Sequence, residues 1–140
     1  MQVFFGKYKE HIAILFLLIA TAFLRFKDLG YSDYISDEPG TFLYRGLPTK
    51  YDMTPLEFIL SQRKGPMQIL IGFMPYPIVG NYKNEFAQRI PFALFNTGAV
   101  IIFYFLIKRL AGSKLIGFLA ALLFSVQGLV VAFGRVAQYQ

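Results

Sequence analysis

The sequence contains no cysteine, and its eight acidic residues are outnumbered by fourteen basic ones. Without cysteine, a disulfide framework and a thiolate metal site are excluded. Polar surface is scarce as well, because 56% of the residues are hydrophobic, whereas ordinary soluble domains are near 45–50% apolar. The basic residues stand at the ends of apolar runs rather than in a stripe. This pattern is typical of membrane proteins, so we predict an integral membrane protein without a nucleic-acid partner.

Three apolar runs are candidates for membrane-spanning helices, each of which needs about 20 residues. The first run is short, and we expect Arg25 at its end to extend its long side chain to the membrane interface. Lipid offers no partners to an open backbone, so the spans should be helical. We therefore predict an all-α integral membrane fold with three transmembrane helices, at about 11–27, 88–110 and 114–134, and an outer loop, 28–87, with short juxtamembrane helices.

The apolar run Pro66–Gly80 has three prolines in 15 residues, which favours an interfacial segment over a span. If it does not cross, five basic residues at helix ends share one side of the membrane. The preference of lysine and arginine for cytoplasmic loops then places the loop 28–87 on the outer or lumenal face of a cell (inner) or endoplasmic reticulum membrane. These five residues are Lys7, Lys9, Lys108, Arg109 and Lys114.

The N-terminal run also resembles a secretory signal peptide, since two lysines precede it and Ala20-Thr21-Ala22 resembles a cleavage site. Further apolar runs follow, however, and Arg25 comes directly after this tripeptide. We therefore favour an uncleaved signal anchor.

The outer loop carries an adjacent carboxylate pair, Asp37-Glu38, followed by Pro39. Glutamate before proline is disfavoured in a helix, so a short helix should begin at Pro39 and end at Gly46. A second helix should begin near Thr54, which starts a capping box, and end before Gly65. The carboxylates could simply cap the first helix, and the basic pair Arg63-Lys64 could simply attract anionic headgroups. The residues alone leave these readings open beside a functional one.

The order of motifs resembles the N-terminal module of polytopic, GT-C type glycosyltransferases that use polyprenyl-phosphate sugars. This family includes the protein O-mannosyltransferases and the lipid A aminoarabinose transferases. The resemblance covers nearly the whole chain, although the family has more spans and commonly a proline where this chain has Gly65. The matching segments are Asp37-Glu38-Pro39, Lys64-Gly65-Pro66-Met67, Arg89-Ile90-Pro91-Phe92-Ala93-Leu94 and Gly134-Arg135.

The resemblance implies transfer of a sugar from a polyprenyl-phosphate donor to an acceptor hydroxyl, with inversion at the anomeric carbon. Asp37 and Glu38 would be the catalytic acids, with Asp37 acting on the acceptor. Lys64, Arg89 and Arg135 would stabilise the donor phosphate, although Arg89 could equally be an interfacial anchor. The partners would be the lipid-linked sugar, membrane lipid and the remaining spans of the enzyme, this chain being a fragment that is inactive alone.

No ligand cluster for a metal is evident, and the requirement for a divalent ion stays open. The alternative function is a small non-enzymatic membrane protein with an accessory or assembly role. Its acidic pair would then be a helix cap and its basic pair a headgroup anchor.

Small residues recur every four positions in the third apolar run, which predicts a face for close helix packing. They are Gly117, Ala121 and Ser125. Asn96 and Gln127 carry side-chain amides within the second and third runs, and we expect both to form hydrogen bonds between helices.

Overall fold

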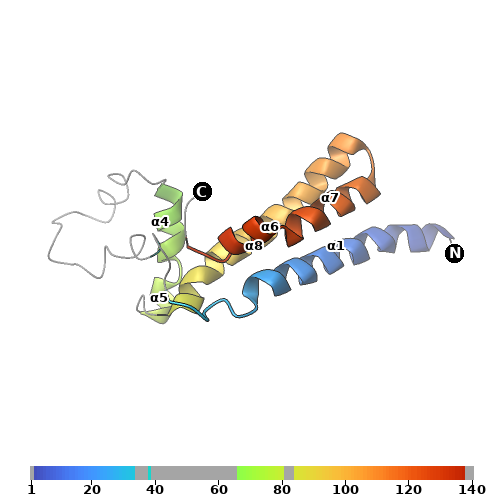
Figure 1. Ribbon diagram of the computed structural model, residues 1–140. Helices are drawn as coiled ribbons and strands as arrows, with labels where there is room; N and C mark the ends of the chain where they lie inside the picture. Colours follow the sequence, from blue (N-terminus) through green and yellow to red (C-terminus); the bar gives the residue numbers. More distant parts are fainter. Residues whose placement is uncertain (1, 34–37, 39–65, 81–83, 138–140) are drawn as a thin grey trace. The chain divides into compact units, whose positions relative to one another are not determined.

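The computed structural model describes residues 2–33, 38, 66–80 and 84–137, and every regular element within these ranges is an α-helix. The chain divides into two compact units. Unit 1 comprises Met1–Lys27 and Ala93–Gly134, and unit 2 comprises Asp28–Phe92 and Arg135–Gln140. The helices are α1 (Gln2–Phe26), α4 (Pro66–Phe73), α5 (Tyr76–Val79), α6 (Glu85–Ala111), α7 (Lys114–Val126) and α8 (Gly128–Phe133) (Figure 1).

The expected all-helical fold is confirmed for the described residues, but three spans are not. By length and composition, α6 is the one described helix long and apolar enough to cross a membrane. Helix α1 has 25 residues, but Lys9, Glu10 and Arg25 leave only a short apolar stretch between them. Helix α7 has 13 residues, fewer than the roughly 20 that a span needs.

The single helix expected over 114–134 is divided at Gln127. This residue has φ −65° and ψ 122°, so it ends α7 and begins α8. Its side-chain Oε1 accepts a hydrogen bond from the Val130 backbone N–H at 3.1 Å. Gln127 therefore caps a helix within its own segment, which is not the interhelical role expected of it. Ser125 contributes to the break, since its hydroxyl donates back to the Leu122 carbonyl at 2.8 Å, a contact that bends helices.

The core of unit 1 forms where α7 and the C-terminal part of α6 pack with α1 (Figure 1). Its buried members come from all three helices: Leu17, Val100, Tyr104 and Ala121. The predicted small-residue face of α7 is confirmed, because all three of its members are buried. Gly117 makes the closest approach, since a Cβ atom there would lie 2.9 Å from the Cβ and 3.0 Å from the backbone Cα and N of Lys108.

A second set of contacts in unit 1 joins the N-terminal half of α1 to the last turns of α6 and the first residue of α7. The Glu10 carboxylate accepts hydrogen bonds from the Tyr104 hydroxyl, at 3.0 Å, and from the ammonium groups of Lys108 and Lys114, the latter at 2.6 Å. Lys108 and Lys114, two of the five basic helix-end residues, thus both contact Glu10 of α1. The bonds from Lys108 and Lys114 hold the pKa of Glu10 at about 2, below its ordinary value of 4.5.

In unit 2, the apolar run with three prolines forms two short helices, α4 and α5, with a turn at Met74-Pro75 between them. At 1.5 Å per residue, the eight residues of α4 extend about 12 Å, well short of a membrane. The interfacial position of this segment stays a prediction. The helices expected from Pro39 and from Thr54 lie outside the described residues.

Gly117→Ala should destabilise unit 1, because its Cβ would press on the backbone of α6. Overpacking of this kind costs about 1–3 kcal/mol, against which the higher helix propensity of alanine returns less than about 1 kcal/mol. Gly98→Ala is the matched control, since nothing lies within 4 Å of its Cβ position. Thermal unfolding of the purified chain in detergent should show a lower midpoint for Gly117→Ala and an unchanged or higher one for Gly98→Ala. Equal midpoints for the two variants would contradict the close packing.

Glu10→Gln should remove a contribution to stability that depends on pH. Because the folded-state pKa of Glu10 is about 2 and its ordinary value is 4.5, the charged carboxylate stabilises the folded chain above pH 4.5. This stabilisation is lost as the pH falls from 4.5 towards 2. The difference in unfolding midpoint between wild type and Glu10→Gln should therefore be constant at neutral pH and shrink across that window. Glu85→Gln, at the first turn of α6, serves as the control variant. A difference that persists unchanged at pH 2 would refute the assignment.

Candidate functional site

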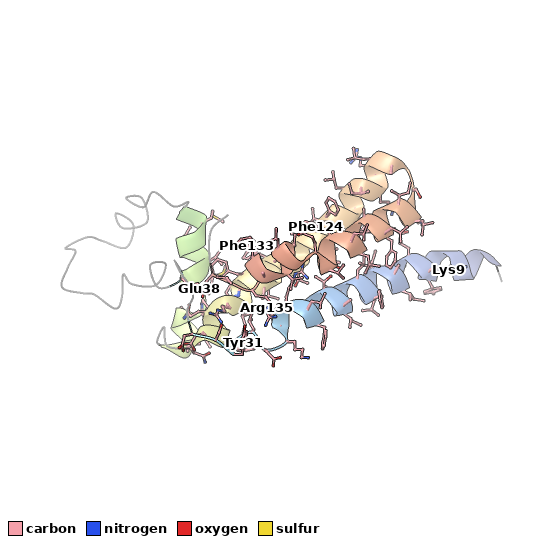
Figure 2. All side chains as sticks on the ribbon, in the orientation of Figure 1. Lys9, Tyr31, Glu38, Phe124, Phe133 and Arg135 are labelled. Carbon is pink, nitrogen blue, oxygen red and sulfur yellow. The ribbon has the colours of Figure 1, made fainter. Side chains whose placement is uncertain are left out.

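Three of the five site residues predicted from the sequence fall in the described part of unit 2. They are Glu38, Arg89 and Arg135, of which Figure 2 labels the first and the last. Asp37 and Lys64 lie outside the described residues.

Glu38 and Arg89 form a bidentate ion pair in the interior of unit 2. Arg89 Nε donates to Glu38 Oε1 at 2.9 Å, and Arg89 Nη2 donates to Glu38 Oε2 at 2.8 Å. The side chains are 2% and 0% exposed. The planar guanidinium matches the carboxylate in this geometry, and the burial excludes water that would weaken their attraction.

The remaining N–H groups of Arg89 all meet backbone oxygens from the segment that follows α1. Nη1 donates to the carbonyl oxygens of Leu29 and Ser32, each at 3.0 Å, and Nη2 donates to that of Asp33 at 3.0 Å. A guanidinium has five N–H donors, so all five have acceptors here. Arg89 thus holds residues 29–33 as well as Glu38.

Three local features allow residues 29–33 to lie against the first turns of α6. The Asn84 side chain accepts a hydrogen bond from the Ala87 N–H at 3.0 Å, so a preferred N-cap residue begins the helix before Arg89. Gly30 packs on the same turns, because a Cβ there would lie 2.8 Å from the Cβ of Phe86. Asp28, two residues before Gly30, has φ 53°, a left-handed conformation that aspartate tolerates better than most residues.

The chain beyond the third apolar run also reaches this pair. The Ala137 backbone N–H donates to Glu38 Oε1 at 2.8 Å, so this carboxylate accepts N–H bonds from both Arg89 and Ala137. Arg135 is partly exposed, and its Nη2 donates to the Asp28 carbonyl at 3.0 Å. Glu38 therefore connects three segments that are far apart in the sequence.

This arrangement is suited to positioning rather than to proton transfer by Glu38 itself. A general base needs an oxygen within reach of the proton that it removes, and both oxygens of Glu38 are engaged by buried donors. The pair fixes Glu38, which directly follows Asp37 in the sequence. Within the described ranges, no three His, Cys, Asp or Glu side chains gather in a way that could hold a metal ion.

Sequence reasoning missed two polar clusters of unit 1. It assigned no role to Glu10, whose partners Tyr104 and Lys108 lie 94 and 98 residues further along the chain and whose partner Lys114 lies further still. It also placed Arg25 at the membrane interface, which is wrong, because the side chain is fully buried and bonded to Asn96 Oδ1 at 2.5 Å. The interhelical hydrogen bond expected of Asn96 is confirmed by the same contact.

Comparisons of the chain with protein-family models, with curated proteins and with solved structures find no match.

Removing either member of the Glu38–Arg89 pair should strongly destabilise the chain, since it leaves the other charge buried and unpaired. We expect Glu38→Gln and Arg89→Met each to cost about 3–5 kcal/mol. The double variant should cost clearly less than the sum of the two, because both charges are gone. Chemical unfolding in detergent gives these values, and Arg135→Met, which loses an exposed contact, should cost only about 1 kcal/mol. Additive costs for Glu38→Gln and Arg89→Met would show that the two side chains do not form the pair.

Proposed function

We propose that the chain is the N-terminal module of a glycosyltransferase that moves a sugar from a polyprenyl-phosphate donor to an acceptor hydroxyl. The proposal rests on one observation beyond the sequence. Two of the four segments that carry the resemblance are joined in unit 2 by the hydrogen bonds from Arg89 to Glu38, and Ala137, two residues beyond a third segment, also donates to Glu38. Each motif alone is weak evidence for the family, and direct hydrogen bonds between two of them support the proposal.

In this proposal Asp37 is the catalytic carboxylate. It accepts the proton of the acceptor hydroxyl, and the oxygen attacks the anomeric carbon from the side opposite the lipid phosphate. The bond from that carbon to the phosphate oxygen breaks, the phosphate leaves with the electron pair, and the configuration inverts. Glu38 and Arg89 are positioning residues that fix the chain next to Asp37. Arg89 donates all five N–H groups within the protein, so Lys64 and Arg135 remain as the cations for the leaving phosphate.

The proposed topology keeps three spans, with α7 and α8 together forming the third. The contacts of Glu10 with Lys108 and Lys114 support one basic end for the helices of unit 1. Lysine and arginine favour the cytoplasmic side, so this end faces the cytoplasm and the loop 28–87 faces outward.

A second candidate function is favoured by the same ion pair. A buried and saturated pair is also what a purely structural clamp would need, and a small membrane protein with an assembly role would use it in that way. The two candidates differ in Asp37, which has a chemical role only in the enzyme.

Asp37→Asn in the chain assembled with the remaining spans should lower sugar transfer by about 10²–10⁴-fold, the usual cost of losing a general base. Expression and membrane insertion should be unchanged, because asparagine caps a helix as well as aspartate does. Asp52→Asn is the control, as an acid of the same loop to which the resemblance gives no role. Transfer from a radiolabelled polyprenyl-phosphate sugar in isolated membranes measures the effect. Normal transfer by Asp37→Asn would favour the structural alternative.

A further inference from the structure

The interior of unit 1 contains a cation whose polar contacts are all neutral. Arg25 is fully buried. Its Nε donates to Asn96 Oδ1 at 2.5 Å, and its Nη1 donates to the carbonyl oxygens of Thr21, at 3.3 Å, and Ser125, at 3.1 Å. Gly134 leaves room for this arrangement, because a Cβ there would lie 2.5 Å from Asn96 Oδ1. Amide and carbonyl oxygens satisfy N–H groups, but they carry no net charge.

No carboxylate of unit 1 is available to neutralise Arg25. The sequence of this unit contains a single acid, Glu10, and it is bonded to Lys108 and Lys114. Glu10 also precedes Arg25 by fifteen residues of α1, about 22 Å along the helix. A buried ion without a counter-charge costs several kcal/mol, so it requires compensation of its charge.

Two donors in this interior also lack acceptors. Arg25 Nη2 and Thr21 Oγ1 are buried and have no hydrogen-bond partner among the described residues. They belong to residues four apart on α1, which lie on the same face of a helix one turn from each other. Arg25 Nη2 can only donate and the Thr21 hydroxyl has a proton to donate, so both can be satisfied by an acceptor, and buried polar groups are rarely left without a partner. The deficit is thus both of acceptors and of negative charge.

We propose that Arg25 and Thr21 bind one small inorganic anion of the size of chloride inside unit 1. Such an anion neutralises the guanidinium and accepts from both Nη2 and Oγ1. The complete burial of Arg25 and Thr21 favours a monatomic ion over phosphate or carboxylate, whose further oxygens would need donors of their own. A water molecule would satisfy the hydrogen bonds but not the charge, so an anion-dependent stability separates the two occupants.

The test is thermal unfolding of the purified chain in detergent, in sodium chloride and in sodium gluconate at equal ionic strength. Gluconate is too large for the site. At a chloride concentration about ten times its Kd, we expect the unfolding midpoint to rise by about 4 °C relative to gluconate. The rise should saturate with chloride concentration, and bromide should substitute for chloride. Equal midpoints in chloride and gluconate would overturn the proposal and assign the site to water.

Thr21→Val is the decisive variant, since it removes the hydroxyl donor at nearly constant shape. Arg25 is unchanged in this variant, so we expect it to fold. It should reduce the chloride-dependent rise to less than half of the wild-type value. Thr97→Val is matched to it as a buried threonine of the same unit whose hydroxyl already donates to the Ala93 carbonyl at 2.8 Å. This control should retain the full rise. A full rise in Thr21→Val, or an equal reduction in both variants, would show that chloride acts elsewhere.

Discussion

The buried ion pair between Glu38 and Arg89 is the interaction on which the described part of unit 2 depends. Its strength follows from complementarity, because one planar carboxylate meets one planar guanidinium and every remaining N–H of Arg89 meets a carbonyl. Such a pair stabilises a fold only while it is complete, since a lone buried charge costs more than the pair contributes. Unit 2 therefore ties the segment after α1, the first turns of α6 and the stretch after α8 to a single contact.

Arg25 in unit 1 presents the opposite solution to the same problem. Both arginines are buried, and both hold a carbonyl oxygen from another part of the chain. Arg89 has an internal carboxylate and uses all its donors, whereas Arg25 meets only neutral oxygens and leaves one nitrogen without a partner. Unit 2 thus supplies a counter-charge to its buried arginine, whereas the described residues of unit 1 supply none to Arg25. The contrast directs attention to Arg25 as much as to the acidic motif.

The helices could be predicted from the sequence wherever an apolar run or a small-residue repeat determined them, as in α6 and at Gly117 in α7. The break at Gln127 could not, because one of the bonds formed at this break is not local. The Ser125 carbonyl, which an uninterrupted helix would pair with the N–H of residue 129, instead receives Arg25 from 100 residues away. The motifs indicate both Glu38 and Arg89, but not the bonds between them or the bond from Ala137 to Glu38, since only folding brings these three residues together. Asp37 and Lys64 remain predictions from the sequence.

The distance along the chain between Arg25 and Ser125 also has a consequence for biosynthesis. Ribosomes add about 5–20 residues per second, so about 5–20 s pass between the synthesis of Arg25 and that of Ser125. Ser125 is absent throughout this interval, and Asn96 is absent for most of it. For most of this time, the guanidinium therefore lacks both of these acceptors. Extending to the headgroups is then the low-energy alternative for a long basic side chain at a helix end. The interfacial position that the sequence suggested for Arg25 would thus describe the nascent chain, and the buried position the finished one.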